Sequence, residues 1–247
     1  MTRRIEELDW QQTPIGVISL RRRLDTVLGE VFEARLDDDF LMSTAFTVSE
    51  SELSRAALGM LTGEGWRVLV GGLGLGYTAV TALADPRVAS VNVVEALGPV
   101  IDWHRRGLLP VSADLVADPR TVLTHADFFA VVGGRAEAAE VSGRRFDAVL
   151  LDIDHTPSHV LDESHRPFYT VEGLTRMREF LEPGGVLGVW SDDPPDETLL
   201  STLREVFVDV SGQVVTFPNP LTGGESACTV HLARRPATGD FTSAGPT

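Results

Sequence analysis

The stretch Arg67-Val68-Leu69-Val70-Gly71-Gly72-Leu73-Gly74-Leu75-Gly76-Tyr77 decides the fold, because an apolar run enters a glycine-dense turn that leads into helix-compatible sequence. Gly72, Gly74 and Gly76 allow positive φ and let backbone N–H groups approach a ligand at the positive end of the next helix. A tight turn built for packing alone is the alternative, but it does not need glycine at four of six positions. The stretch therefore predicts a strand, a nucleoside-binding turn and a helix.

Apolar runs alternate with amphipathic stretches after this motif. The predicted buried strands are residues 67–70, 90–94, 121–123, 146–151 and 185–190. Such strands, alternating with helices, are typical of a doubly wound parallel sheet. Two further runs, 206–215 and 227–232, are joined by a turn-rich loop too short for a crossover helix, so they predict an antiparallel pair. We therefore expect an α/β, Rossmann-like sheet of seven strands, mostly parallel with an antiparallel last strand.

The residues before the motif have a different sequence pattern. Residues 14–20 and 30–36 are rich in β-branched and apolar side chains, with Gly29 between them, and predict short antiparallel strands. Ser49 and Glu52 have the spacing of a capping box, which predicts a helix from about 50 to 62 that ends at Gly63. We expect a small N-terminal β-unit over 1–48, a nucleoside-binding domain over 49–235 and a flexible tail over 236–247.

Composition excludes several classes of partner. The 247 residues carry 36 acidic and 21 basic side chains, a formal charge of −15, which disfavours nucleic acid and favours a small cationic substrate. No run reaches the roughly 18 apolar residues of a membrane helix, so no membrane association is expected. Cys228 is the single cysteine, which excludes a disulfide framework and predicts a cytoplasmic protein.

Two acids follow the next predicted strands. Glu95 lies 19 positions past Gly76, where a carboxylate can accept both ribose hydroxyls of a nicotinamide cofactor or of S-adenosylmethionine. The spacing Gly74-x-Gly76-x-x-Ala79 also satisfies the relaxed dinucleotide fingerprint. Asp127 follows the 121–123 strand and either takes the exocyclic amine of adenine or caps a helix. Asp127 and the antiparallel last pair favour the S-adenosyl interpretation over NAD.

Asp152 directly follows the 146–151 strand, at the sheet edge where open α/β sheets bind ligands. A carboxylate there can hold a cationic amine and take its proton as the nitrogen attacks an activated carbon, so Asp152 is the predicted catalytic residue. The alternative is a helix cap or a strand-end carboxylate satisfied by backbone donors.

Further polar side chains follow Asp152 and the 185–190 strand. His155 and His159 are four residues apart and could share a helix face as metal ligands with Asp152 or Asp154, but no further ligand cluster is evident, so no metal is expected. Asp192, with its neighbour Asp193, either joins an amine pocket or caps a helix that begins near Pro195.

On these residues, the chain from about 10 to 235 resembles the spermidine synthase family, the polyamine aminopropyltransferases built on a class I methyltransferase-type fold. Residues 71–76 resemble the family's Gly-Gly-Gly-Asp-Gly loop, and 146–152 resemble its strand ending in Asp-Ser-Ser-Asp-Pro. Phe168-Tyr169 and 181–185 resemble its Phe-Tyr and Leu-x-Pro-Gly-Gly stretches.

The resemblance implies a role for each matching residue. Asp152 would be the general base. The cofactor-binding residues would be Gly72, Gly74, Gly76, Glu95 and Asp127, and the substrate-binding residues would be Asp154, His155, Asp192 and Tyr169. Two positions depart from the family pattern: Leu75 stands where the glycine loop carries an aspartate, and His155 stands where Asp-Ser-Ser-Asp has its second aspartate.

The resemblance also implies an activity: transfer of an aminopropyl group from decarboxylated S-adenosylmethionine to an amine, in a homodimer of polyamine biosynthesis. One alternative is a methyltransferase that uses intact S-adenosylmethionine on a small molecule. Another, motivated by Leu75 and His155, is a non-catalytic nucleoside-binding or scaffold protein of the same fold.

Overall fold

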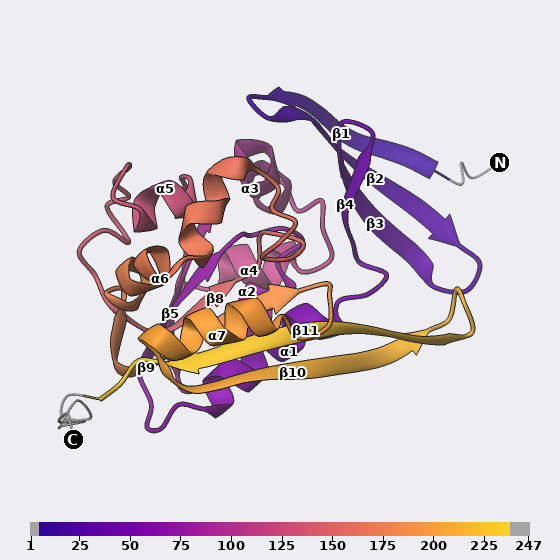
Figure 1. Cartoon of the computed structure of the whole chain (residues 1–247). Coiled ribbons are helices and arrows are strands. Elements are labelled where there is room, and N and C mark those ends of the chain that lie inside the picture. The colour runs from indigo at the N-terminus through magenta and orange to yellow at the C-terminus, as the bar shows by residue number, and fades with distance from the viewer. Residues whose placement is uncertain (1–4, 238–247) are drawn as a thin grey trace, which may run out of the picture.

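A seven-stranded sheet forms the centre of the body in the computed structural model, which describes residues 5–237 (Figure 1). Its strands, in chain order, are β5 (Trp66–Gly71), β6 (Val88–Glu95), β7 (Thr121–His125), β8 (Phe146–Leu151), β9 (Leu181–Ser191), β10 (Val208–Asn219) and β11 (Gly224–Arg234). They lie in the order β10-β11-β9-β8-β5-β6-β7. Strands β5 to β9 pair in parallel, and β11 pairs antiparallel with both β9 and β10. The predicted sheet and its antiparallel last pair are confirmed.

Helices cover both faces of this sheet. They are α1 (Val48–Gly59), α2 (Tyr77–Ala84), α3 (Gly98–Arg105), α4 (Ser112–Ala117), α5 (Phe128–Val132), the 3-10 helix η1 (Glu163–Tyr169), α6 (Val171–Arg178) and α7 (Glu197–Val206). Alternate strand residues face opposite layers: Val68 and Val70 pack in the core with α1 to α4, and Leu69 packs in the core with α5 to α7. The body is therefore a three-layer α/β sandwich.

The strand order creates a crevice at the middle of the sheet. From β5 the chain adds β6 and β7 on one side, and β8 and β9 then lie on the other side of β5. The loops that follow β5 and β8 consequently leave the sheet toward opposite faces, and ligands of open α/β sheets bind in the space between such loops.

A second sheet of four antiparallel strands precedes the body. Its strands are β1 (Ile5–Thr13), β2 (Gly16–Asp25), β3 (Gly29–Leu36) and β4 (Asp39–Ser43), paired in chain order. The two predicted strands are confirmed as β2 and β3. Strands β1 and β4 are additional, since β1 is mostly polar and β4 is only five residues long. Gly29 begins β3 rather than forming the turn, which is closed by the Asp25 carboxylate accepting from Val27 and Leu28 N–H.

The predicted start and end of the first helix are wrong. Helix α1 begins at Val48 with Thr47 as N-cap, and no capping box forms, because the Ser49 hydroxyl donates to the Glu50 carboxylate instead. The helix ends at Gly59, four residues before Gly63.

Strands β10 and β11 form a long hairpin that extends beyond the body toward the N-terminal sheet (Figure 1). Strand β10 runs to Asn219, so the connecting turn is shorter than predicted, and Val206 belongs to α7 instead of a strand. Phe217 on this hairpin meets Phe46, with ring centroids 5.8 Å apart. The predicted tail over 236–247 lies, apart from its first two residues, outside the described residues.

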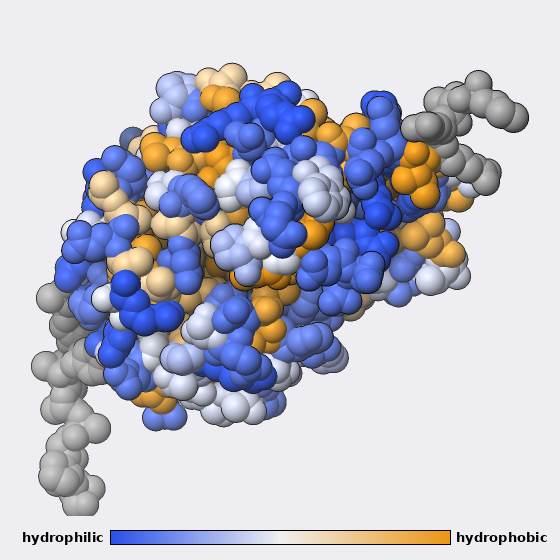
Figure 2. Space-filling model, turned by 90° about the horizontal axis from the view of Figure 1, so that it is seen from above, coloured by the Kyte–Doolittle hydropathy of each residue, from blue (hydrophilic) through white to orange (hydrophobic). Residues whose placement is uncertain are grey.

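The visible surface is mainly hydrophilic, with separate hydrophobic patches that include several over the N-terminal sheet (Figure 2). Within residues 5–237, no helix has the length and apolar character needed to cross a membrane.

Candidate active site

A pocket of about 590 Å³ opens at the carboxyl ends of β5, β6, β8 and β9. Eight of the ten predicted site residues line it: Gly72, Gly74, Gly76, Glu95, Asp127, Asp152, His155 and Asp192. The remaining two, Asp154 and Tyr169, do not. The strand ends thus bring together acids that are far apart in the sequence.

The glycine loop is pressed against its surroundings. Gly72 has a φ of 91°, and a Cβ atom there would lie 2.2 Å from the Asp152 carbonyl oxygen. Gly76 also has a φ of 91° and is the N-cap of α2, where a Cβ would lie 2.7 Å from the His104 ring. Both positions therefore require glycine for backbone conformation and for space.

Glu95, the last residue of β6, presents a buried carboxylate beside this loop. It accepts N–H groups of Leu73 at 2.9 Å and Leu97 at 2.7 Å. Burial raises the pKa of Glu95, although these backbone donors favour the charged form. The carboxylate is thereby fixed at the pocket wall, with lone pairs left to accept hydroxyl groups.

Asp127 caps a helix and also lines the pocket. Its carboxylate accepts the Ala130 N–H at 3.0 Å and caps α5, as the alternative predicted. The residue also lines the pocket, next to Phe128 and Phe129. A capping carboxylate keeps a second oxygen that can accept a bond from a ligand.

Asp152 lies half-buried at the end of β8, opposite the glycine loop. Its Oδ2 accepts a 2.5 Å hydrogen bond from the Thr78 hydroxyl on α2. Burial raises the pKa of Asp152 to about 6, and the Thr78 bond opposes this shift. This bond comes from a side chain, so Asp152 is not the helix cap that the alternative described.

Glu50 is a site residue that the sequence reasoning missed. It lines the same pocket from the first turn of α1, and its carboxylate accepts from Ser49 at 2.8 Å. Burial, followed by repulsion from the Asp152 carboxylate, raises the pKa of Glu50 to about 7. No sequence signal separates Glu50 from an ordinary acid in a first helical turn, because only the packing of α1 beside α2 brings it to Asp152.

Asp192 follows β9 and lies on the rim of the pocket, where it is exposed. Its Oδ1 is 3.6 Å from the Cys228 thiol on β11. The helix-cap interpretation of Asp192 and Asp193 is wrong, because Asp196 caps α7 by accepting from Thr198 and Leu199. Asp192 therefore remains free to face a ligand in the pocket.

Asp154 and Tyr169, both predicted to bind substrate, lie outside the pocket lining and bond to each other. Asp154 is buried and accepts from the Tyr169 hydroxyl, from His165 Nδ1 and from the Leu161 N–H, each at 2.8 Å. Burial and the Asp154 charge raise the pKa of Tyr169 well above its usual range. This carboxylate fixes the loop that carries His165, whose ring stacks on Phe129 at 4.0 Å and lines the pocket.

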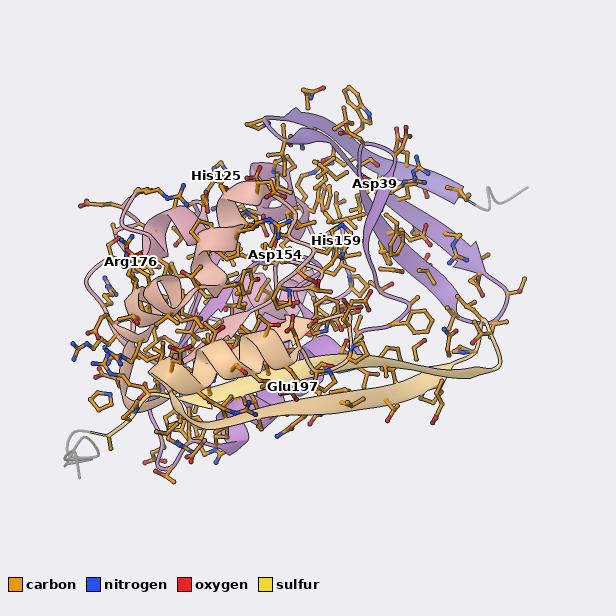
Figure 3. All side chains as sticks on the ribbon, in the orientation of Figure 1. Asp39, His125, Asp154, His159, Arg176 and Glu197 are labelled. Carbon is orange, nitrogen blue, oxygen red and sulfur yellow. The ribbon has the colours of Figure 1, made fainter. Side chains whose placement is uncertain are left out.

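The helical arrangement considered for His155 and His159 is not formed. Residues 152–162 lie in a loop, and the two rings are 5.6 Å apart (Figure 3 shows His159 and Asp154 in this region). Within residues 5–237, no group of three or more His, Cys, Asp or Glu side chains is arranged to hold a metal ion. His155 itself lines the pocket.

The sheet order, the helix layers and the pocket at the switch point define a class I methyltransferase-type fold preceded by a four-stranded sheet. Solved structures share this architecture. The spermidine synthase of Thermotoga maritima superposes with a TM-score of 0.68 at 19% identity, covering 94% of this chain and 74% of that one. The expected resemblance to the spermidine synthases is thus confirmed in the fold.

Sequence comparison finds relatives with two related activities in their names. Putrescine N-methyltransferase 3 of Nicotiana tabacum is 27% identical over 146 residues, which is 57% of this chain and 35% of that enzyme. Polyamine aminopropyltransferase 2 of Pseudomonas aeruginosa is 29% identical over 165 residues, covering 63% of this chain and 43% of the enzyme. The matched region therefore spans less than half of either relative. No family model matches the chain.

Proposed function

We propose that this chain is a spermidine synthase-like transferase that moves an aminopropyl group from decarboxylated S-adenosylmethionine to an amine. The observation that carries the proposal is the position of Asp152, which lines the same pocket as the glycine loop and whose carboxylate is held by the Thr78 hydroxyl. The names of the sequence relatives and the shared spermidine synthase fold support it.

The nucleoside side of the pocket fits such a donor. Gly72, Gly74 and Gly76 line the pocket with backbone that can approach a ligand. Glu95 offers carboxylate oxygens for ribose hydroxyls, and Asp127 offers one for the adenine amine. These residues follow β5, β6 and β7 in turn, so the ribose and base would lie along one direction of the sheet edge. This arrangement supports an S-adenosyl co-substrate.

Asp152 would act on the acceptor. The donor supplies a carbon made electrophilic by its sulfonium, and the sulfur leaves with the bonding electron pair as neutral methylthioadenosine. As the amine lone pair forms the new C–N bond, Asp152 accepts the proton that the nitrogen loses. Thr78, by donating to Oδ2, fixes the carboxylate orientation, and a pKa of about 6 keeps Asp152 ionised at neutral pH.

Glu50 would add a second negative charge for the cationic reactants. Leu75, which is 6% exposed in the pocket wall, contributes no charge to the loop. Glu50 and Asp192 then remain, beside Asp152, as the carboxylates of the acceptor end. His155 would line the acceptor path without a negative charge.

Methyl transfer from intact S-adenosylmethionine is the second candidate. The putrescine N-methyltransferase relatives favour it, and so does Leu75, because this chain lacks the carboxylate expected in the loop for the donor amine of an aminopropyltransferase. Both candidates use the same pocket and the same base.

Calorimetric titration with decarboxylated S-adenosylmethionine, the intact compound, methylthioadenosine and NAD tests the proposal. Tightest binding of the decarboxylated donor, with methylthioadenosine detected by mass spectrometry after incubation with amines, is expected. S-adenosylhomocysteine as the product would establish methyl transfer instead. Binding of a sulfur nucleoside without product would favour a non-catalytic protein, and binding of NAD alone would overturn both transferase candidates.

The same proposal extends to assembly and location. The resemblance implies a cytoplasmic homodimer formed through the N-terminal sheet, and Ile5, Trp10 and Phe40, all more than half exposed there, are apolar side chains that a partner would cover. Sedimentation analysis of the full chain would give twice the monomer mass of 26.7 kDa.

A further inference from the structure

The pocket runs along one edge of the sheet, so the strand order gives the order of the lining residues along the pocket. From the β7 end to the hairpin end, the lining residues come from Asp127, Glu95, the glycine loop, Asp152 and Asp192, and then from the hairpin with Phe217 and Cys228. If the donor lies along β5 to β7, as proposed above, the acceptor reaches Asp152 from the side of β9 and the hairpin.

The pocket wall on that side is apolar. The rings of Phe46 and Phe217, 5.8 Å apart, form part of it, and Phe217 is 5% exposed. The N-terminal sheet and its link contribute Ile15, Phe40, Leu41, Met42, Ser43 and Phe46 to the lining, and none of these carries a charge. The acids of the pocket all belong to the body.

The carboxylates are matched in number by the cations of the proposed reaction. A decarboxylated S-adenosyl donor carries a sulfonium and an ammonium, and the acceptor brings one amine. Glu50, Asp152 and Asp192 are the three carboxylates on the side of α1, β8 and β9, and Asp162 also lines the pocket, from the loop that carries His165. A second ammonium on the acceptor would lie against Phe46 and Phe217, whose ring faces offer a cation–π contact in place of the ion pair that a carboxylate would supply.

We infer that the acceptor is a monoamine with an apolar substituent, its nitrogen bound between Asp152 and Asp192 and its substituent lying along Phe46 and Phe217. This inference rests on the proposed function. In this arrangement the hairpin and the N-terminal link select the substituent, and the strand ends of the body bind the nitrogen.

A matched pair of amines tests the inference. n-Pentylamine and 1,4-diaminobutane have the same number of heavy atoms and differ by one terminal methyl in place of one amine. Each is titrated into the full chain saturated with methylthioadenosine, and product formation is followed with both donors. We expect n-pentylamine to bind at least about tenfold more tightly, because its terminal methyl leaves water for an apolar wall.

Substitution of Phe46 tests whether the apolar substituent of the amine lies against this ring. Phe46 is only half-buried and lies outside both sheets. Phe46→Asp should abolish the preference for n-pentylamine or reverse it, and Phe46→Leu, the matched control, should retain it. Unchanged affinity for methylthioadenosine shows that each variant is folded. If Phe46→Asp still binds n-pentylamine more tightly than 1,4-diaminobutane, the substituent does not lie against this wall.

Two other outcomes separate this inference from the proposed function. Tighter binding and faster alkylation of 1,4-diaminobutane by the unmodified chain would overturn the monoamine inference and leave the transferase proposal intact. Failure to bind methylthioadenosine, or to alkylate either amine with either donor, would overturn the transferase proposal and the inference with it.

Discussion

At the scale of single residues, the site depends on two neighbouring carboxyls whose environments differ. Asp152 is held by Thr78 on α2, and Glu50 is held by Ser49 on α1. Burial raises both pKa values, to about 6 and about 7, and the two charges repel each other. At neutral pH the pair is therefore partly protonated, which suits a site that binds cations and accepts a proton.

Asp152→Asn tests the base. The amide cannot take the proton of the attacking nitrogen, so we expect turnover to fall by roughly 100-fold or more. Methylthioadenosine affinity should stay within about threefold, because the glycine loop and Glu95 are untouched. Initial-rate kinetics and calorimetry measure the two effects, and normal turnover would remove Asp152 from this role.

Glu50→Gln tests the pair through its pH dependence. Both groups lose their protons as pH rises, so kcat/KM of the unmodified chain should rise through two steps, near 6 and near 7. The glutamine does not titrate, and the variant should show one step, near 6. If both steps persist in Glu50→Gln, the upper one belongs to another group.

At the scale of elements, the loops after β5 and β8 are the parts with the least freedom. Gly72 packs against the Asp152 backbone, and Gly76 packs against His104 on α3. Across the pocket, the buried Asp154 carboxylate ties residues 161, 165 and 169 together. Two loops far apart in the sequence are thus fixed separately and meet at the pocket.

Gly76→Ala tests the glycine loop. Its φ of 91° and the His104 ring 2.7 Å from the added Cβ both oppose the methyl group. We expect the affinity for methylthioadenosine to fall by at least about tenfold and the unfolding free energy to fall by about 1–3 kcal/mol. Gly134→Ala is the matched control, since it has a φ of 69° but nothing within 4 Å of its Cβ. Equal nucleoside affinity in the two variants would contradict a close fit at Gly76.

Asp154→Ala tests the structural role given to this residue. Its removal leaves the Tyr169 hydroxyl and the Leu161 N–H without their partner, which should lower the unfolding free energy by about 1–3 kcal/mol. Loss of the His165 contact should also raise the KM for the donor more than it lowers kcat. A large loss of kcat with normal stability would instead place Asp154 in the chemistry.

At the scale of the whole molecule, the pocket forms where three separate segments meet. The body supplies the carboxylates, the β10–β11 hairpin supplies Phe217, and the link from the N-terminal sheet supplies Phe46 (Figure 1). The charge of −15 is consistent with this division, since the acids of the pocket lie on the body and many others lie on the hydrophilic surface (Figure 2).

The stability of the whole chain should depend on pH through the buried pair. A carboxyl whose pKa is raised by folding stabilises the fold while it is protonated, and this contribution is lost as pH rises through the folded pKa, here about 6 to 7. Glu50→Gln should therefore raise the melting temperature at about pH 8 by more than it does at about pH 5, where the folded chain keeps the Glu50 proton and the unfolded chain has begun to lose it. Calorimetric scans at the two pH values measure this, and an equal shift at both would contradict it.

The sequence by itself determined the sheet and most of the nucleoside side of the site. The apolar runs and the turn at 71–76 predict β5 to β9, because buried parallel strands need uninterrupted apolar residues and a close backbone approach needs glycine. Glu95, Asp127 and Asp152 follow strands directly, so the edge of the sheet alone brings them together.

Only the tertiary structure decided the acceptor side. Glu50 and Phe46 belong to local contexts that look like an ordinary helix start and its preceding loop, and Asp154 follows β8 only two residues after Asp152. Which of them face the pocket depends on how α1 packs on α2, how the hairpin reaches Phe46 and which way a loop turns. The contact between Glu50 and Thr78 spans 28 residues, and the rings of Phe46 and Phe217 lie much farther apart in the sequence. Local sequence patterns do not record either contact.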